Sequence, residues 1–77
     1  MVRIDHILDA RNLICPMPVI RTSEQIAKLK TGQTLEVVCT DPGALEDIPA
    51  WCRIHGHEVI HTESRNGESF IQLRIHR

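Results

Sequence analysis

The stretch from Leu35 to Leu45 reads Leu-Glu-Val-Val-Cys-Thr-Asp-Pro-Gly-Ala-Leu, and it holds the end of a strand and the start of a helix. Leu35, Val37 and Cys39 occupy every second position, which is the period of a strand with one inward face. Asp41-Pro42 follows at once, and Asp is a favoured N-cap residue while Pro fits the first helical position. The sequence therefore predicts a strand that turns directly into a helix.

Three further segments have the alternating period of strands. They cover residues 2–9, 57–63 and 70–75. In the last of them Ile71, Leu73 and Ile75 share one face. Asn66-Gly67 lies between the last two segments and is a strong signal for a tight hairpin turn. We therefore expect four strands, the last two joined as a hairpin.

Two segments have the period of amphipathic helices. The first is expected to begin at Cys15-Pro16 and to stop at Gly32, and the second to run from Asp41 to Gly56. Pro49 lies well inside the second and predicts a kink or break, because proline removes a backbone donor. The inward faces are expected to comprise Val19, Ile20, Ile26, Ala27 and Leu29 in the first helix, and Ala44, Leu45, Ile48, Trp51 and Cys52 in the second.

The resulting element order is β-α-β-α-β-β. Right-handed crossovers make the first three strands parallel and put both helices on one face of the sheet, and the hairpin adds an antiparallel strand. We expect an α/β two-layer sandwich with a mixed four-stranded sheet, built as a single domain over residues 1–77.

Composition narrows the possible functions. The chain has 77 residues, 42% of them hydrophobic, with one Phe, one Trp and no Tyr, so its core is thin and its chemistry is expected at the surface. The formal charge is -1 without charged blocks, which disfavours direct nucleic-acid binding. There is no signal-like or membrane-length apolar run, so we expect a cytoplasmic protein that does not bind membranes, with reduced thiols.

Cys15-Pro16-Met17-Pro18 is the segment most suited to chemistry. Two prolines fit the first helical turn, where backbone N–H groups lack intrahelical acceptors, and this puts Cys15 at or beside the N-cap. There the helix dipole and the N–H groups of Met17 and Val19 are expected to stabilise a sulfur anion and lower the thiol pKa from its usual ~8.5. A thiolate attacks sulfur efficiently. The alternative is a cysteine that simply packs as a small hydrophobe.

The other two cysteines are better explained by packing. Cys39 falls on the inward face of its strand, and Cys52 falls on the apolar arc of the second helix beside Trp51. A resolving role for Cys52 stays open. His55, His57 and His61 with Cys52 resemble a metal cluster, but their spacing is unlike that of zinc sites, and we expect no metal and no other cofactor.

Three basic residues are candidates for a role in the chemistry of Cys15, although nothing in the sequence places His6 beside the thiol. Arg11 and Arg21 bracket the motif and can steer an anionic persulfide or an acidic partner, although ordinary solvated charge also explains them. His6 can be considered as a base for the thiol, but an edge histidine is the default interpretation.

Cys15-Pro16-Met17-Pro18 resembles the Cys-Pro-x-Pro motif of the TusA (SirA-like) sulfur-carrier family. The similarity extends over nearly the whole chain. It includes Leu8-Asp9-Ala10, Gly32-Gln33-Thr34-Leu35, Asp41-Pro42-Gly43-Ala44, Asp47-Ile48-Pro49 and Gly56-His57-Glu58.

This resemblance implies that Cys15 carries a persulfide. The donor would be a cysteine desulfurase or a rhodanese-like protein, and the acceptor a DsrE-like or TusD-like protein. From their positions around the thiol, we expect Pro16, Met17, Pro18 and Arg21 to contact the transferred sulfur or the partner, and we expect a monomer that docks transiently. The end use varies among tRNA thiolation, molybdenum-cofactor synthesis and sulfur oxidation.

A second class of function stays open at this point. A small α/β sandwich with an exposed sheet also suits a non-catalytic regulatory or RNA-binding module. The weak charge and the scarcity of aromatic residues argue against RNA.

Overall fold

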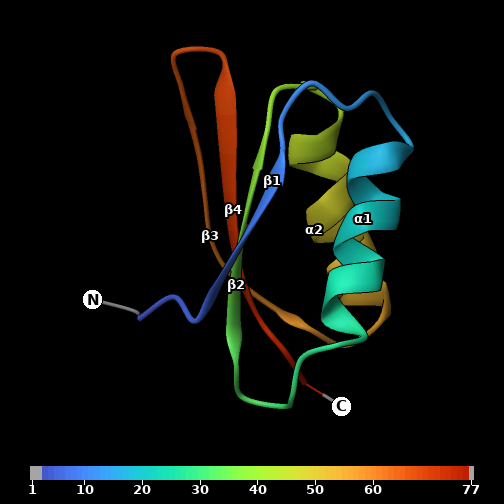
Figure 1. Cartoon of the computed structure of the whole chain (residues 1–77), viewed down its shortest axis with the longest axis vertical. Helices are drawn as coiled ribbons and strands as arrows, with labels where there is room; N and C mark the ends of the chain where they lie inside the picture. The colour runs from blue at the N-terminus through green and yellow to red at the C-terminus, as the bar shows by residue number, and fades with distance from the viewer. Residues whose placement is uncertain (1–2, 77) are drawn as a thin grey trace.

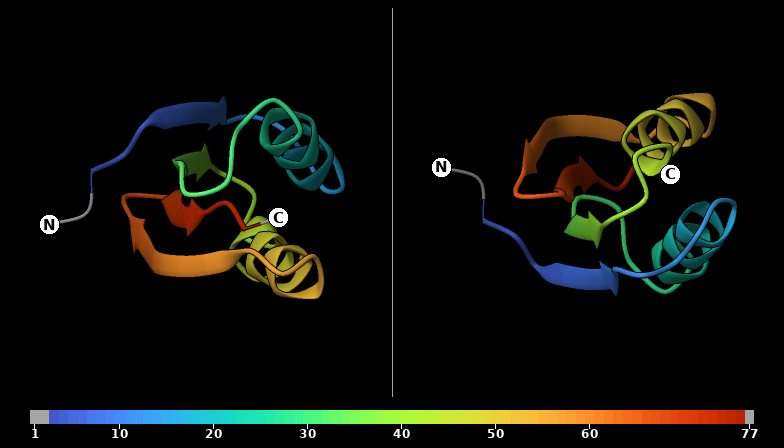
Figure 2. Two further views of the ribbon diagram at one scale, coloured as in Figure 1. Left: turned by 90° about the horizontal axis from the view of Figure 1, so that it is seen from below. Right: turned by 90° about the horizontal axis from the view of Figure 1, so that it is seen from above.

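The chain folds into two layers, a four-stranded sheet and a pair of helices on one of its faces (Figures 1 and 2). The structure is a computed structural model, and it describes residues 3–76. The predicted α/β sandwich and its β-α-β-α-β-β order are confirmed. The elements are β1 (His6–Ala10), α1 (Met17–Ile26), β2 (Thr34–Cys39), α2 (Ala44–Ile54), β3 (Glu58–Arg65) and β4 (Glu68–Arg74).

The strands lie in the order β1-β2-β4-β3. β1 and β2 are parallel, with His6 opposite Leu35 and Ala10 opposite Cys39. β4 is antiparallel to both of its neighbours, β2 and β3. The first three strands therefore point the same way, as predicted, but the last strand of the chain lies between β2 and β3 and occupies the centre of the sheet.

The core lies between the sheet and the helices. Leu35, Val37 and Cys39 of β2 are fully buried, as the period-2 pattern predicts. Ile71 and Leu73 of β4 and Ile75 just beyond it are equally inaccessible. The helices contribute Ile26, Ala44, Ile48 and Cys52 to this core.

α1 is shorter and turned slightly from its predicted orientation. It ends at Ile26, because the chain then enters a turn through Leu29, and Gly32 with φ of 92° belongs to the turn that enters β2. Ile20, expected inside, is 42% exposed, and Ala27 is exposed as well. Thr22 takes an inward position, since its hydroxyl donates to the Pro18 carbonyl at 2.8 Å and so carries no unpaired group into the core.

α2 starts later than predicted and is continuous. Its first residue is Ala44, because residues 41–43 form a turn in which the Ala44 N–H donates to the Asp41 carbonyl at 3.0 Å. The helix runs through Pro49 to Ile54, so the predicted break at Pro49 is wrong. Pro49 is buried inside this continuous helix.

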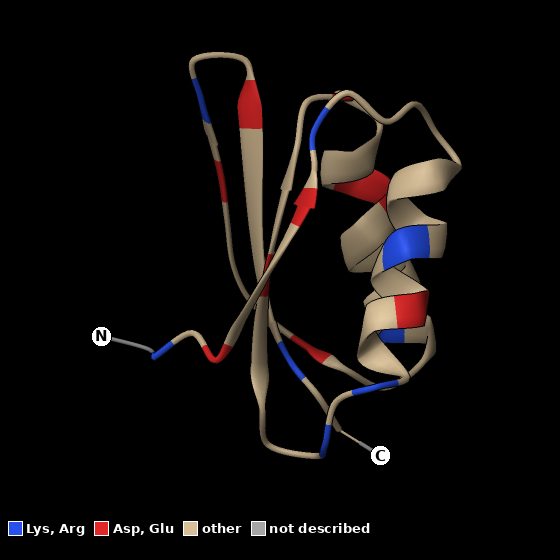
Figure 3. Ribbon diagram, in the orientation of Figure 1, with Lys and Arg blue, Asp and Glu red and all other residues tan. Residues whose placement is uncertain are grey.

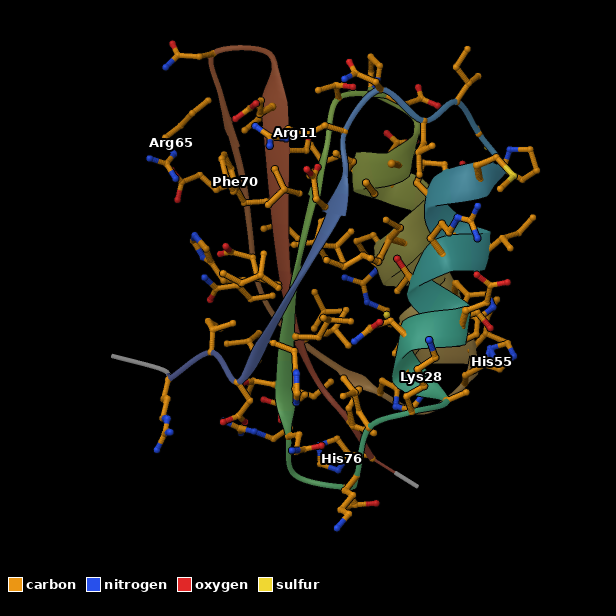
Figure 4. The ribbon with its side chains drawn as sticks, viewed as in Figure 1. Arg11, Lys28, His55, Arg65, Phe70 and His76 are labelled. Carbon is orange, nitrogen blue, oxygen red and sulfur yellow. The ribbon has the colours of Figure 1, made fainter. Side chains whose placement is uncertain are left out.

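The strand limits also differ slightly from the prediction. β1 begins at His6 rather than residue 2, and Val2 lies outside the described residues. β3 runs to Arg65, directly into the hairpin turn, where Asn66 and Gly67 have φ of 52° and 77°. On the face away from the helices, the Arg65 guanidinium lies 4.5 Å above the Phe70 ring (Figure 4).

Both helices begin at the same end of the molecule. Each follows a parallel strand, so the first turns of α1 and α2 lie beside the carboxyl ends of β1 and β2 (Figure 1). This arrangement brings the loop before α1 next to the start of α2. None of the helices within residues 3–76 is long and apolar enough to cross a membrane.

Candidate functional site

Cys15 lies in the loop between β1 and α1, and it is exposed. The loop is a tight turn in which the Met17 N–H donates to the Ile14 carbonyl at 2.9 Å. The Cys15–Pro16 peptide bond is cis, Pro16 precedes the helix, and Pro18 lies in its first turn with a buried ring. The expectation that Cys15 stands next to the helix start is confirmed, and the reading of Cys15 as a packed hydrophobe is wrong.

Asp41 fixes the backbone of this loop. Its Oδ2 atom accepts the Cys15 N–H at 2.7 Å, and its Oδ1 atom accepts the Gly43 N–H at 3.1 Å. The carboxylate thus ties the Cys15 loop to the turn that leads into α2. The prediction that Asp41 is the N-cap of the second helix is wrong, because Gly43 is the N-cap. The Asp41 carboxylate instead supports the turn before α2 and accepts from a residue that is 26 positions away in the sequence.

Asp47 contacts the thiol itself. The Cys15 Sγ atom lies 3.2 Å from Asp47 Oδ2, with the thiol as donor. Asp47 is exposed in the first turns of α2, and its own N–H donates to the Gly43 carbonyl at 2.9 Å. Two carboxylates from the start of α2 therefore surround Cys15, one on its backbone and one on its sulfur.

These carboxylates make the Cys15 thiol less acidic, whereas the sequence predicted a more acidic thiol. The hydrogen bond to Asp47, then desolvation and the negative charges of Asp47 and Asp41, raise the pKa of Cys15. A full negative charge lies 3.2 Å from the sulfur, whereas a helix N-terminus is equivalent to only about half a positive charge. The Met17 N–H, expected to face the sulfur, is already donated to Ile14. The prediction of an acidic thiol is therefore wrong.

The two arginines near the motif are paired with acidic side chains. Arg21 on α1 bonds Glu24 at 3.0 Å. Arg11 bonds Asp9 at 3.0 Å and Glu68 at 3.4 Å, and Figure 4 shows it lying over the strands. Basic and acidic residues are scattered over both the sheet and the helices (Figure 3). A role for Arg21, and for Pro16, Met17 and Pro18, in contacting sulfur or a partner stays a prediction.

Cys39 and Cys52 are fully buried, as predicted. Burial raises the pKa of both thiols, that of Cys52 to about 11. A thiol that is inaccessible and protonated cannot resolve a disulfide or a persulfide. Of the three cysteines of the chain, all of them described, Cys15 is therefore the one available to a partner.

The histidines take part in packing and hydrogen bonds away from Cys15. His55 stacks on Trp51 with ring centroids 4.1 Å apart, and it lies at the far end of the helix layer (Figure 4). His57 Nδ1 accepts the His76 N–H at 3.1 Å, and His61 bonds Glu63. His6 starts β1, at the opposite end of that strand from Cys15. Within residues 3–76 no three His, Cys, Asp or Glu side chains are arranged to hold a metal.

Asp47 is the site residue that sequence reasoning missed. No local sequence pattern predicts that Asp47 contacts Cys15. The contact forms because the parallel strands β1 and β2 bring the starts of the two helices together. The nearest hint is Asp47-Ile48-Pro49, which belongs to the family resemblance but does not reveal what the carboxylate touches.

Comparisons with known proteins agree on the family. The family model described as "Sulfurtransferase TusA" matches residues 6–77. The sulfur carrier protein TusA of Allochromatium vinosum is 34% identical over 68 residues, which span 88% of this chain and 90% of that protein. The putative sulfur carrier protein YrkF of Bacillus subtilis is 41% identical over 64 residues, which span 83% of this chain but 35% of that protein.

A solved structure supports the fold. The crystal structure of a SirA-like protein from Desulfitobacterium hafniense superposes with a TM-score of 0.79, covering 90% of this chain and 95% of that one at 23% identity. The fold and the exposed cysteine ahead of α1 define a small α/β domain with a thiol presented at one end. With the family match over residues 6–77, the chain belongs to the TusA family.

Proposed function

We propose that this chain is a sulfur carrier that holds a persulfide on Cys15. The observation that carries the proposal is exposure: Cys15 is open to a partner at the start of α1, while Cys39 and Cys52 are inaccessible. The printed names of the relatives, sulfur carrier and putative sulfur carrier, support the same role.

The proposed loading step exchanges one sulfur–sulfur bond for another. The Cys15 thiolate attacks the terminal sulfur of a donor persulfide, the donor's S–S bond breaks, and the donor leaves as a thiolate. The proton lost by Cys15 is taken up by the leaving thiolate directly or through water. No external oxidant is needed, because the S–S bond that forms replaces the S–S bond that breaks. Unloading repeats the reaction, with an acceptor thiolate attacking the terminal sulfur on Cys15.

The proposed partners and pathways are those that the family resemblance implies. The donor is a cysteine desulfurase or a rhodanese-like protein, and the acceptor a DsrE-like or TusD-like protein, in tRNA thiolation, molybdenum-cofactor synthesis or sulfur oxidation in the cytoplasm. Pro16, Met17, Pro18 and Arg21 form the contact surface around the thiol. The chain acts as a single domain and docks transiently as a monomer.

Intact-mass spectrometry after incubation with a cysteine desulfurase and cysteine tests the proposal. The wild-type chain is expected to gain the mass of one sulfur atom, and reductant is expected to remove it. Cys15→Ser, which keeps the size of the side chain but not the thiol, serves as the control. A wild-type chain that gains no sulfur, or a variant that gains as much, would contradict the proposal.

A further inference from the structure

Asp47 lies in the space where a transferred sulfur would otherwise fit. Its Oδ2 atom is 3.2 Å from Cys15 Sγ, and an added sulfur forms a bond of about 2.05 Å. A sulfur placed along that line would lie roughly 1 Å from the carboxylate oxygen, which is far inside van der Waals contact. The terminal sulfur of a loaded Cys15 must therefore point away from Asp47.

Hydrogen bonds fix the backbone on both sides of this contact. Asp41 holds the Cys15 N–H at 2.7 Å, and Asp47 is anchored through its own N–H to Gly43 at 2.9 Å. The groups with charge that face the thiol are these two carboxylates, both from residues at or just before α2. Arg21 on α1 is engaged with Glu24.

Protonation decides whether the contact attracts or repels. A thiol donates its proton to the Asp47 carboxylate, but a thiolate or an ionised persulfide has no proton to give and meets a like charge. Since a persulfide is a stronger acid than its parent thiol, loading converts an attractive contact into a repulsive one.

We infer that Asp47 is a positioning residue for the sulfur transfer proposed above, because it binds the unloaded Cys15 thiol and turns the terminal sulfur of the loaded carrier away from α2. The inference rests on the proposed function for its second half. In the unloaded carrier the thiol is held protonated until it leaves Asp47. In the loaded carrier the sulfur faces solvent and any acceptor that docks there.

The test compares Asp47→Asn with Glu46→Gln as the matched control. Both substitutions remove one acidic charge from the first turns of α2, but Glu46 has no hydrogen bond to Cys15. The rate of alkylation of Cys15 by iodoacetamide is measured against pH for each protein. Asp47→Asn is expected to move the inflection of the rate to lower pH, because the thiol loses its charged acceptor, and to make alkylation about threefold faster near pH 7. Glu46→Gln is expected to follow the wild type.

Identical pH profiles for Asp47→Asn and the wild type would overturn the inference. So would an equal shift in Glu46→Gln, because that would reflect the overall charge of α2. A purely structural role for Asp47 would change the unfolding midpoint and leave the inflection where it is, so thermal unfolding is recorded for all three proteins.

A second measurement separates this inference from the proposed function. Each protein is loaded with sulfur, and the alkylation of the persulfide is followed at pH 8. The persulfide rate is expected to change little in Asp47→Asn, which keeps the size of the side chain. It is expected to fall by about twofold in Asp47→Ala, where the terminal sulfur can point toward α2 as well as toward solvent. Equal rates in Asp47→Ala and the wild type would overturn the positioning role. A wild-type chain that takes no sulfur, while the thiol inflection still shifts, would overturn the proposed function and support the contact between Asp47 and the thiol.

Discussion

The backbone N–H of Cys15 donates a hydrogen bond of 2.7 Å to the Oδ2 atom of Asp41, across 26 residues of sequence. This bond joins the loop before α1 to the turn before α2, and the same carboxylate accepts the Gly43 N–H. Asp41 therefore holds the backbone of Cys15, while Asp47 accepts the hydrogen bond from its thiol.

Asp41→Ala is expected to lower the free energy of unfolding by about 1–2 kcal/mol, because two N–H groups lose a charged acceptor. Urea denaturation gives the value. Glu46→Ala, an exposed neighbour on α2, is the control and should change stability by less than about 0.5 kcal/mol. Equal effects of the two substitutions would show that the hydrogen bonds of Asp41 do not contribute to the free energy of unfolding.

Ile71→Ala is expected to lower the free energy of unfolding by about 2–5 kcal/mol, because Ile71 is fully buried on the central strand β4 and the substitution leaves a cavity. Ile7→Ala removes the same atoms from β1, where the side chain is 68% exposed, and should cost less than about 1 kcal/mol. The comparison uses urea midpoints. Similar losses of stability in the two variants would contradict the placement of Ile71 in the core.

Gly67→Ala is expected to destabilise the hairpin by about 1–2 kcal/mol, because its φ of 77° is unfavourable for any residue with a Cβ. Gly43→Ala is the control. Gly43 has φ of -64°, and an added Cβ meets Asp41 and Asp47 oxygens at ordinary contact distances of 3.6 and 3.7 Å. Thermal unfolding should separate the two by roughly 4–8 °C per kcal/mol. A stable Gly67→Ala variant would argue against the observed turn.

Iodoacetamide is expected to label one cysteine in the folded chain and three in denaturant. Cys39 and Cys52 have no exposed surface, and burial raises the pKa of Cys52 to about 11, so both react only on unfolding. Mass spectrometry counts the labels at pH 8. Two or more labels on the native protein would mean that a second thiol is open to partners.

The fold was largely predictable because its signals are local. The alternation in Leu35-Val37-Cys39 and in Ile71-Leu73-Ile75, and the turn at Asn66-Gly67, each depend on a few neighbouring residues. The position of β4 in the centre of the sheet was not predictable in this way, because a hairpin can pair with β2 through either of its strands. Ile20 was misplaced since Pro18 and Thr22, rather than the most apolar residues, take the inward positions at the start of α1.

The site was only half predictable from the sequence. Exposure of Cys15 follows from the two prolines at a helix start, and this was confirmed. Its acidity depends on Asp47, 32 residues away, and on the parallel pairing of β1 with β2 that brings the two helices together. An argument from the helix dipole alone leaves out that charge and so gives the opposite direction for the pKa.

Mapping the transferred sulfur tests the central claim most directly. After loading by a cysteine desulfurase and blocking with iodoacetamide, trypsin cleaves after Arg11 and Arg21 and releases Cys15 in residues 12–21, while Cys39 and Cys52 stay together in residues 31–53. The account predicts one extra sulfur, found on the peptide of residues 12–21. Extra sulfur on the peptide of residues 31–53, with none on residues 12–21, would contradict it.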